Sequence, residues 1–228
     1  MTTDKPTRPV VAIDGPAGTG KSTIAKELAR TLGLPYLDTG AMYRAVAWKA
    51  LQDGLALDNE DAIAALAGGA ALDVGPDSVR IDGRDVTLAI RTPQIDRAAA
   101  MTARLPKVRA VLVARQQREG ERGGIVVEGR DIGTVVFPDA DVKIYLDASS
   151  EERARRRAAD PAHGVGRQAA LAEVESELKA RDHSDSTRTT SPLAVAKDAV
   201  HLDTTGLSID EAVDKVMAMV QSFLFRSR

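Results

Sequence analysis

A glycine-rich segment near the N-terminus restricts the possible folds of this chain more than any other feature. Residues 15–22 read Gly-Pro-Ala-Gly-Thr-Gly-Lys-Ser and fit the pattern G-x-x-x-x-G-K-[ST]. The apolar run Val10 to Ile13 precedes this segment and predicts a strand, and residues 22–30 follow it with the apolar spacing of a helix. A strand, a glycine loop and a helix in this order predict a phosphate cradle, because loop N–H groups and the helix N-terminus both face the anion.

The parts of this loop have distinct predicted roles. Lys21 is expected to reach the terminal phosphates, and the Ser22 hydroxyl is expected to ligate Mg²⁺. The residues predicted to bind the nucleotide are Gly15, Pro16, Ala17, Gly18, Thr19, Gly20, Lys21, Ser22 and Thr23. The pattern indicates a nucleoside triphosphate and leaves open what the protein does with it.

Short apolar runs alternate with helical segments along much of the chain. Runs with strand character occur at residues 36–38, 125–128, 142–146 and 199–203. Near-continuous apolar character predicts strands that are covered on both faces, as in a parallel sheet wrapped by helices. The predicted fold class is therefore α/β, with three layers.

Residues 72–90 break this rhythm. Val79 and Ile81 alternate with polar residues, Asp82-Gly83 indicates a turn, and Val86, Leu88 and Ile90 alternate again. The pattern predicts an antiparallel hairpin, with residues 71–74 as a third strand.

The hairpin suggests a small subdomain inserted into the parallel sheet. We expect one domain over residues 1–228, with the insert at about 62–118 and its helical part at 92–118. Residues 151–182 are strongly charged and predict a basic lid of two helices, interrupted at Asp160-Pro161 and at residues 164–166. The core then comprises residues 8–61, 119–150 and 183–228.

Composition excludes several classes of protein. With 228 residues, of which 43% are hydrophobic, the chain can fill one sizeable core. A net charge of −2 provides no general attraction to long nucleic acids or to membranes. The chain has no cysteine and no apolar run near the ~20 residues of a membrane span. We therefore expect a monomer in the cytoplasm, without nucleic-acid or membrane partners.

Three classes of protein use such a phosphate loop: GTPase switches, motor or assembly ATPases, and small-molecule kinases. A GTPase would need an Asn-Lys-x-Asp element for guanine, but the single asparagine, Asn59, is followed by Glu60. A motor or assembly ATPase usually has a longer chain that contacts other subunits or nucleic acid, so this class stays a weak alternative. A kinase for a phosphorylated acceptor requires a second anion site that is rich in arginine.

Arginines next to the predicted strand ends meet that requirement. Arg44 follows the second strand and Arg130 follows the third, and strand C-termini of an open α/β sheet line the ligand crevice. A further basic group follows the fourth strand and comprises Arg153, Arg155, Arg156, Arg157 and Arg181. We expect about half of this group to be structural. Those that face inward would neutralise charge on a transferred phosphoryl group.

Together these motifs resemble those of the bacterial cytidylate (CMP) kinases, a family of P-loop nucleoside monophosphate kinases. The resemblance covers nearly the whole chain and is carried by residues 12–22, 37–44, 128–138, 143–148 and 181–188. Residues 129–138, Gly-Arg-Asp-Ile-Gly-Thr-Val-Val-Phe-Pro, are much more specific than the phosphate loop. The resemblance implies a five-stranded core sheet ordered 2-3-1-4-5, a monophosphate-binding insert and a helical lid over the triphosphate.

The resemblance also implies an activity, which is direct in-line transfer of the γ-phosphoryl group of ATP to CMP or dCMP with Mg²⁺. Arg44 and Arg130 would then grip the acceptor phosphate, and Arg109 with Asp131 would contact cytosine. Further substrate contacts are implied for Thr39, for Arg181 and Asp185 at the ribose, and for Arg188 near the base or phosphate. The expected catalytic residues are Lys21, Arg130, Arg157 and Arg181. A P-loop ATPase, or a kinase for another small phosphorylated acceptor, remains the alternative.

One position departs from the family pattern. Where the family often has a serine hydroxyl that faces the base, this chain has Ala100. Either base recognition lacks one hydrogen bond, or Thr102 supplies the hydroxyl instead. A neutral hydrogen bond is worth about 0.5 to 1.5 kcal/mol, so we expect weaker discrimination between bases and the same substrate.

Overall fold

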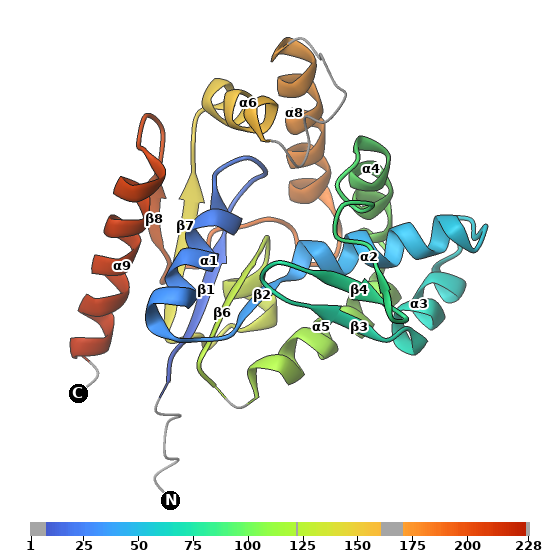
Figure 1. Cartoon of the computed structure of the whole chain (residues 1–228), viewed down its shortest axis with the longest axis horizontal. Coiled ribbons are helices and arrows are strands. Elements are labelled where there is room, and N and C mark those ends of the chain that lie inside the picture. The colour runs from blue at the N-terminus through green and yellow to red at the C-terminus, as the bar shows by residue number, and fades with distance from the viewer. Residues whose placement is uncertain (1–7, 122, 161–170, 227–228) are drawn as a thin grey trace, which may run out of the picture.

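A parallel sheet of five strands forms the core of the protein (Figure 1). The computed structural model describes residues 8–121, 123–160 and 171–226. The strands of this sheet are β1 (Val10–Asp14), β2 (Tyr36–Asp38), β6 (Ile125–Gly129), β7 (Val142–Asp147) and β8 (Val200–Asp203). They lie in the order β2-β6-β1-β7-β8, which is 2-3-1-4-5 when the core strands alone are numbered. The predicted strand order is confirmed.

The register of these strands brings several acidic residues to one edge of the sheet. Asp14 at the end of β1 pairs with Gly129 of β6 and with Tyr145 of β7, and Asp38 of β2 pairs with Glu128 of β6. All neighbouring pairs are parallel, so these positions share the C-terminal edge. Ligands of open α/β sheets bind outside that edge.

Helices cover both faces of the sheet, as the near-continuous apolar strands predict. On one face, α1 (Lys21–Leu32) and α9 (Ile209–Arg226) pack on β1, with Leu28 and Val216 fully buried between them. On the other face lie α2 (Thr39–Gln52), α3 (Glu60–Gly69) and α5 (Pro106–Gly120). The three-layer α/β fold is confirmed.

A second, antiparallel sheet contains β3 (Leu72–Val74), β4 (Val79–Ile81) and β5 (Arg84–Asp85). The predicted turn forms at Asp82 and Gly83, which have positive φ values of 50° and 77°. The predicted strand through Val86, Leu88 and Ile90 is wrong, because strand pairing ends at Asp85.

The cause is local hydrogen bonding after β5. The Asp85 carboxylate accepts from the Thr87 N–H at 2.9 Å, and the Ile90 N–H donates to the Val86 carbonyl at 3.0 Å. The resulting turn buries Val86 and Ile90 on one side and leaves Leu88 78% exposed. Apolar residues four positions apart fit a turn as well as they fit alternation in a strand.

The remaining helices lie beside the C-terminal edge of the large sheet (Figure 1). They are α4 (Pro93–Thr102), α6 (Ser150–Ala159) and α8 (Leu171–Thr187), and a short π-helix, η1 (Ile132–Val136), follows β6. In the described part of the predicted lid lie α6 and α8, while the predicted break at residues 164–166 lies outside the described residues. The limits of core, insert and lid stay predictions, and α8 continues through the lid boundary expected at residue 182. Within the described ranges, no helix is long and apolar enough to cross a membrane.

Candidate active site

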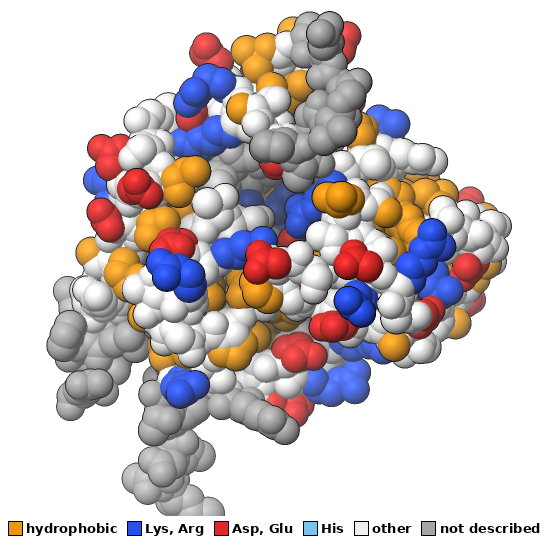
Figure 2. Space-filling view, viewed as in Figure 1, with side chains coloured by type: hydrophobic (Ala, Val, Ile, Leu, Met, Phe, Trp, Pro, Cys, Tyr) orange, Lys and Arg blue, Asp and Glu red, His pale blue; other side chains and the backbone are white. Residues whose placement is uncertain are grey.

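A cleft of about 630 Å³ lies at the C-terminal edge of the parallel sheet. The phosphate loop, α2, α4, the end of β6, both lid helices and the start of α9 all contribute side chains to it. Figure 2 shows basic side chains around a hollow in the centre of this face. The cleft is where the crevice of an open α/β sheet is expected.

The phosphate loop has backbone conformations that require glycine. Gly15, Gly18 and Gly20 have φ values of 144°, 82° and 89°. A Cβ on Gly15 would lie 2.0 Å from the Leu146 carbonyl oxygen, so no side chain fits there. The loop leads directly into α1 at Lys21, which brings the N-terminus of that helix to the cleft.

Lys21 is buried at the base of this loop. Its Nζ donates to the Pro16 carbonyl at 2.5 Å and to the Thr19 hydroxyl at 3.2 Å. Burial lowers the pKa of Lys21 well below its usual range, and the nearby Arg130 and Arg181 act in the same direction. An anion at this position would favour the charged ammonium and oppose that shift.

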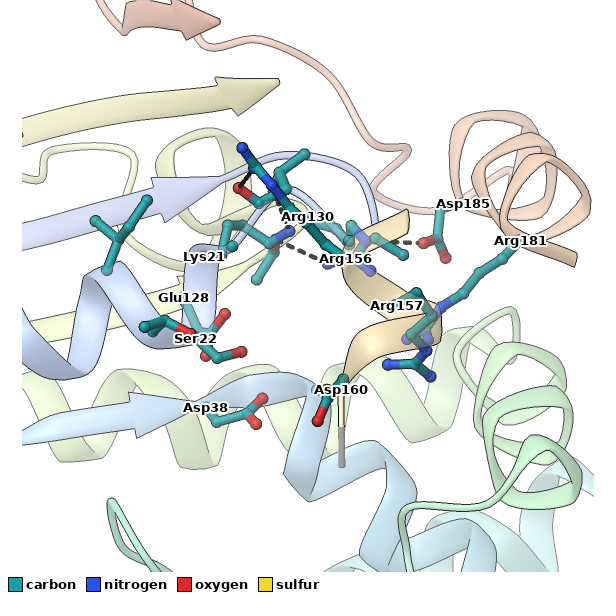
Figure 3. Close-up of a pocket in the computed structure, with 18 of the residues that line it drawn as sticks. Lys21, Ser22, Asp38, Glu128, Arg130, Arg156, Arg157, Asp160, Arg181 and Asp185 are labelled. Carbon is teal, nitrogen blue, oxygen red and sulfur yellow. Dashed lines mark hydrogen bonds and ion pairs between the residues drawn. The ribbon is translucent and has the colours of Figure 1, made fainter. Parts of the chain in front are cut away.

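Two carboxylates of the cleft stand at strand ends, Glu128 on β6 and Asp38 on β2, and Figure 3 shows Glu128 beside Ser22. Burial raises the pKa of Glu128, and the charge of Asp38 raises it further. The Tyr36 hydroxyl donates to Glu128, and Ser22 is also within hydrogen-bonding reach of that carboxylate. Hydroxyl and carboxylate oxygens are ligands that suit Mg²⁺, so this part of the cleft fits the ion together with phosphate oxygens.

Two arginines line the cleft near the strand ends, Arg44 on α2 and Arg130 directly after β6. Arg44 donates to Asp38 at 2.9 Å, and the Arg130 Nε donates to Asp185 at 2.9 Å. Among the described residues, the buried Nε of Arg44 has no hydrogen-bond partner. Arg91 lies 3.7 Å from the same carboxylate of Asp38 and adds positive charge. The arrangement provides several guanidinium donors for an anion beside the phosphate loop.

A buried ion-pair network forms the inner part of the cleft. Asp131 accepts hydrogen bonds from Arg109 and, at 3.2 Å, from Arg188. Arg109 is 2% exposed, and its guanidinium lies 5.6 Å from the centre of the Tyr43 ring. Within the described chain, the Arg109 Nε has no hydrogen-bond partner. Two arginines therefore share one buried carboxylate in this part of the cleft.

Helix α4 borders this network with small side chains. Ala99, Ala100 and Ala103 line the cleft. Thr102 is fully buried, and its hydroxyl donates to the Ala99 carbonyl at 3.2 Å. Thr102 thus points away from the cleft and does not supply the hydroxyl that Ala100 lacks.

Three arginines of α6, Arg155, Arg156 and Arg157, line the cleft. Two arginines of the helix also bind backbone carbonyls. Arg153 is buried and donates to the carbonyls of Ala148 and Ala17, both at 3.1 Å. Arg156 donates to the carbonyls of Thr19 at 3.2 Å and Thr204 at 2.7 Å, so it ties the phosphate loop to the segment after β8. These two hold the backbone around the cleft.

The other two arginines of α6 differ in exposure. Arg155 is mostly exposed and pairs with Glu152. Arg157 lines the cleft together with Arg181 of α8, and both bind Asp96 of α4. The expectation that some of these arginines are structural therefore holds for Arg153 and Arg156.

Most of the predicted site residues lie around this one cleft. Those that line it are Ala17, Gly18, Thr19, Gly20, Lys21, Ser22, Thr23, Thr39, Arg44, Arg109, Arg130, Asp131, Arg157, Arg181, Asp185 and Arg188. Gly15 and Pro16, at the start of the loop, do not line the cleft. Gly15 packs against Leu146 of β7, and the Pro16 carbonyl accepts from Lys21. The Thr39 hydroxyl donates to the Glu128 carbonyl at 2.8 Å, so that side chain already joins β2 to β6.

Several residues that lie in or next to the cleft were not predicted from the sequence. Asp38, Glu128 and Arg91 line it, and Asp96 lies behind its arginines. Asp38 and Glu128 each stand at the C-terminal end of a predicted strand, and that position is a signal that could have identified them. For Asp96 the sequence contains no comparable signal, because its partners come from two distant helices.

Comparison with known proteins places the whole chain in one family. A model of the cytidylate kinase family matches residues 11–222. The cytidylate kinase of Desulfitobacterium hafniense (strain Y51) is 52% identical over 212 residues, which is 92% of this chain and 91% of that protein. The chain belongs to the cytidylate kinase family. The cytidylate kinase of Solibacter usitatus (strain Ellin6076) is 49% identical over 235 residues, covering 100% of this chain and 99% of its own.

A solved structure of lower similarity supports the fold alone. The gluconokinase from Sinorhizobium meliloti 1021 matches with a TM-score of 0.52 and 15% identity, over 96% of this chain and 98% of that one. This chain and that gluconokinase therefore share the same overall fold. The predicted family and fold class are both confirmed.

Proposed function

We propose that this cytidylate kinase family member transfers the γ-phosphoryl group of MgATP to CMP or dCMP, which yields ADP and CDP or dCDP. The observation that carries this proposal is that one cleft joins three sites. The phosphate loop, the arginine pair Arg44 and Arg130, and the network around Asp131 all line it. A nucleoside monophosphate and a nucleoside triphosphate can therefore bind side by side in this cleft.

The donor end of the cleft comprises Lys21, Ser22 and the N-terminus of α1. Lys21 and the loop N–H groups would bind the β- and γ-phosphates. Ser22 and Glu128 would hold Mg²⁺, which supplies positive charge to the phosphate oxygens when it is bound. The cleft continues to Leu207 and Ile209, and we place the adenine ring of ATP against these apolar side chains.

Arg44 and Arg130 are the proposed ligands of the acceptor phosphate. Arg44 lies in the second turn of α2, which follows β2, and Arg130 directly follows β6; both line the cleft together with the phosphate loop. Their guanidinium groups can each donate two parallel hydrogen bonds to phosphate oxygens. A monophosphate has its second pKa near 6, so it is mostly ionised at neutral pH and a general base is not required.

Asp131 and Arg109 are the proposed readers of cytosine. The amino group of cytosine is a donor that a carboxylate accepts, whereas uracil has a carbonyl oxygen at the same position. Arg109 lines the cleft, and its guanidinium would donate to the ring acceptors of the base. Because the pair is buried, a mismatched base would leave polar groups without partners and bind more weakly.

The remaining cleft residues are proposed to act on the sugar and the migrating group. Asp185 would accept from a ribose hydroxyl, and Arg188 would hold Asp131 in place from the other side. Arg157 and Arg181 would neutralise charge that spreads over the oxygens of the phosphoryl group. Transfer would be direct and in line, with no covalent enzyme intermediate, so positioning and electrostatics provide the catalysis. For location and assembly, we propose a monomer in the cytoplasm.

The proposal is tested by measuring ADP release from MgATP with a panel of acceptors. The panel contains CMP, dCMP, UMP, AMP, GMP and a phosphorylated non-nucleotide. We expect rapid ADP release with CMP or dCMP and slow release with the others. Equal rates with and without any acceptor would instead identify an ATPase. A preference for the non-nucleotide would identify a kinase for another phosphorylated acceptor.

A further inference from the structure

Asp96 joins three helices that come from different parts of the chain. It lies on α4, and its two carboxylate oxygens accept from Arg157 of α6 and from Arg181 of α8, the latter at 3.2 Å. Its side chain is 15% exposed, so these ion pairs are largely shielded from water. One carboxylate therefore sets the relative positions of two arginines on separate helices.

The carboxylate holds these arginines from the side away from the nucleotide. Arg157 and Arg181 line the 630 Å³ cleft and also a second cavity of about 430 Å³ between α4, α6 and α8. Asp96 lines the second cavity and is not among the residues that line the nucleotide cleft. Figure 3 shows the two arginine side chains converging beside the cleft. Phosphate oxygens in the cleft would thus meet the guanidinium groups without displacing Asp96.

The charges of the two arginines need such a partner. Burial lowers the pKa of Arg157 to about 10 and also lowers the pKa of Arg181. The charge of Arg181 also lowers the pKa of Arg157, and the charge of Arg130 lowers that of Arg181. The Asp96 carboxylate favours the charged state of both Arg157 and Arg181. Without Asp96, mutual repulsion and rotamer freedom would separate the two groups.

The same helix also borders the proposed site for the acceptor base. Ala99 and Ala100 follow Asp96 by about one helical turn and line the nucleotide cleft. A single short helix therefore carries both the wall of the base site and the carboxylate behind the arginines. Its position links the acceptor site to the two arginines of the lid.

We propose that Asp96 is a positioning residue for phosphoryl transfer: it holds Arg157 and Arg181 together at the transferred group without contacting substrate. This inference rests on the proposed function, in which both arginines act on that group. A residue of this kind affects the rate of the chemical step more than the binding of either nucleotide.

The test compares the variants Asp96→Asn and Asp96→Glu with the unmodified chain, using MgATP and CMP. We expect kcat to fall about tenfold to a hundredfold in Asp96→Asn, since misplaced catalytic groups cost about this much. KM for CMP and for ATP should stay within about twofold. Asp96→Glu keeps the charge and should recover part of the lost kcat. The control is Asp61→Asn, an exposed carboxylate on α3 that pairs with Lys107 and should leave kcat unchanged.

A double-mutant cycle shows whether Asp96 acts through its arginine partners. In an Arg157→Ala background, Asp96→Asn should lower kcat by a clearly smaller factor than in the unmodified chain. Equal factors in both backgrounds would overturn the inference, as would an unchanged kcat in Asp96→Asn. Parallel losses of kcat and thermal stability without recovery in Asp96→Glu would show a purely structural role. Failure of the unmodified chain to form CDP would instead overturn the proposed function itself.

Discussion

The Nε of Arg130 donates to the Asp185 carboxylate at 2.9 Å, which links the end of β6 to helix α8. Arg130 is the proposed ligand of the acceptor phosphate, and Asp185 is the proposed ligand of its sugar. Burial would raise the pKa of Asp185, but Arg130 and two further arginines hold it below its usual range. The phosphate and sugar sites therefore share one charged pair, which fixes the guanidinium before a nucleotide binds.

Replacing Arg130 by lysine should remove most of the activity although the positive charge remains. An ammonium group lacks the planar donor pair that binds both Asp185 and a phosphate oxygen, so we expect kcat/KM for CMP to fall about a hundredfold. Steady-state kinetics with varied CMP measure this loss. The matched control is Arg118→Lys on α5, whose exposed guanidinium donates to the carbonyl of Ala114. A near-normal rate in Arg130→Lys would remove Arg130 from the acceptor site.

Asp131→Asn should weaken the preference for cytosine. The amide presents a donor beside the amino group of cytosine, and it leaves Arg109 and Arg188 without their shared carboxylate. We expect the ratio of kcat/KM for CMP over UMP to drop about fivefold to a hundredfold, because one buried polar mismatch costs about 1 to 3 kcal/mol. Competition between the two nucleotides in one reaction measures the ratio. An unchanged ratio would show that another group reads the base.

Ala100→Ser should strengthen CMP binding. Ala100 lines the cleft beside the proposed base site, and a serine hydroxyl there would add one neutral hydrogen bond. The expected gain is about 0.5 to 1.5 kcal/mol, which corresponds to a KM for CMP that is about two- to tenfold lower. No change in KM would mean that a hydroxyl at this position does not reach the base.

Ala100 was identified from the sequence as a departure from the family pattern, but the side chains around it could not be predicted. The phosphate loop and the arginines near the strand ends could be predicted from the residues, because strand ends of a parallel sheet converge whatever the side chains do. The strand order was implied by the family resemblance alone. The ion pairs Arg109–Asp131 and Arg157–Asp96 could not be predicted. They depend on side-chain directions across elements that are 22 and 61 residues apart in the chain.

The segment after β5 shows a similar limit. Val86 and Ile90 are buried as an alternating strand would have them, yet the backbone between them forms a turn. The hydrogen bond from the Thr87 N–H to the Asp85 carboxylate favours this turn over a continued strand. Arg153 and Arg156 likewise resemble other basic residues in the sequence, and only their carbonyl partners reveal that they brace the phosphate loop.

Asp14 should make the stability of the protein depend on pH. Its carboxylate accepts from the N–H groups of Ile132 and Gly133 at 2.8 and 2.7 Å, and burial raises its pKa from 3.8 to about 6. The folded pKa lies above the unfolded one, so the stabilising contribution is complete below pH 3.8 and is lost as pH rises through about 6.

The pH dependence is isolated by comparison with Asp14→Asn, which does not titrate. The free energy of unfolding of the unmodified chain, minus that of the variant, should decrease by about 3 kcal/mol between pH 3.8 and pH 7. Denaturant unfolding at a series of pH values measures this difference. A difference that is constant or rises with pH would contradict the raised pKa of Asp14.

The central claim is that the γ-phosphoryl group of ATP moves directly to a cytidine monophosphate in the cleft. The most direct measurement supplies ATP labelled in the γ-phosphate together with Mg²⁺ and CMP, and separates the products. We expect the label to appear in CDP in an amount equal to the ADP formed, with little in inorganic phosphate. Label that accumulates in inorganic phosphate while CMP stays unchanged would contradict it.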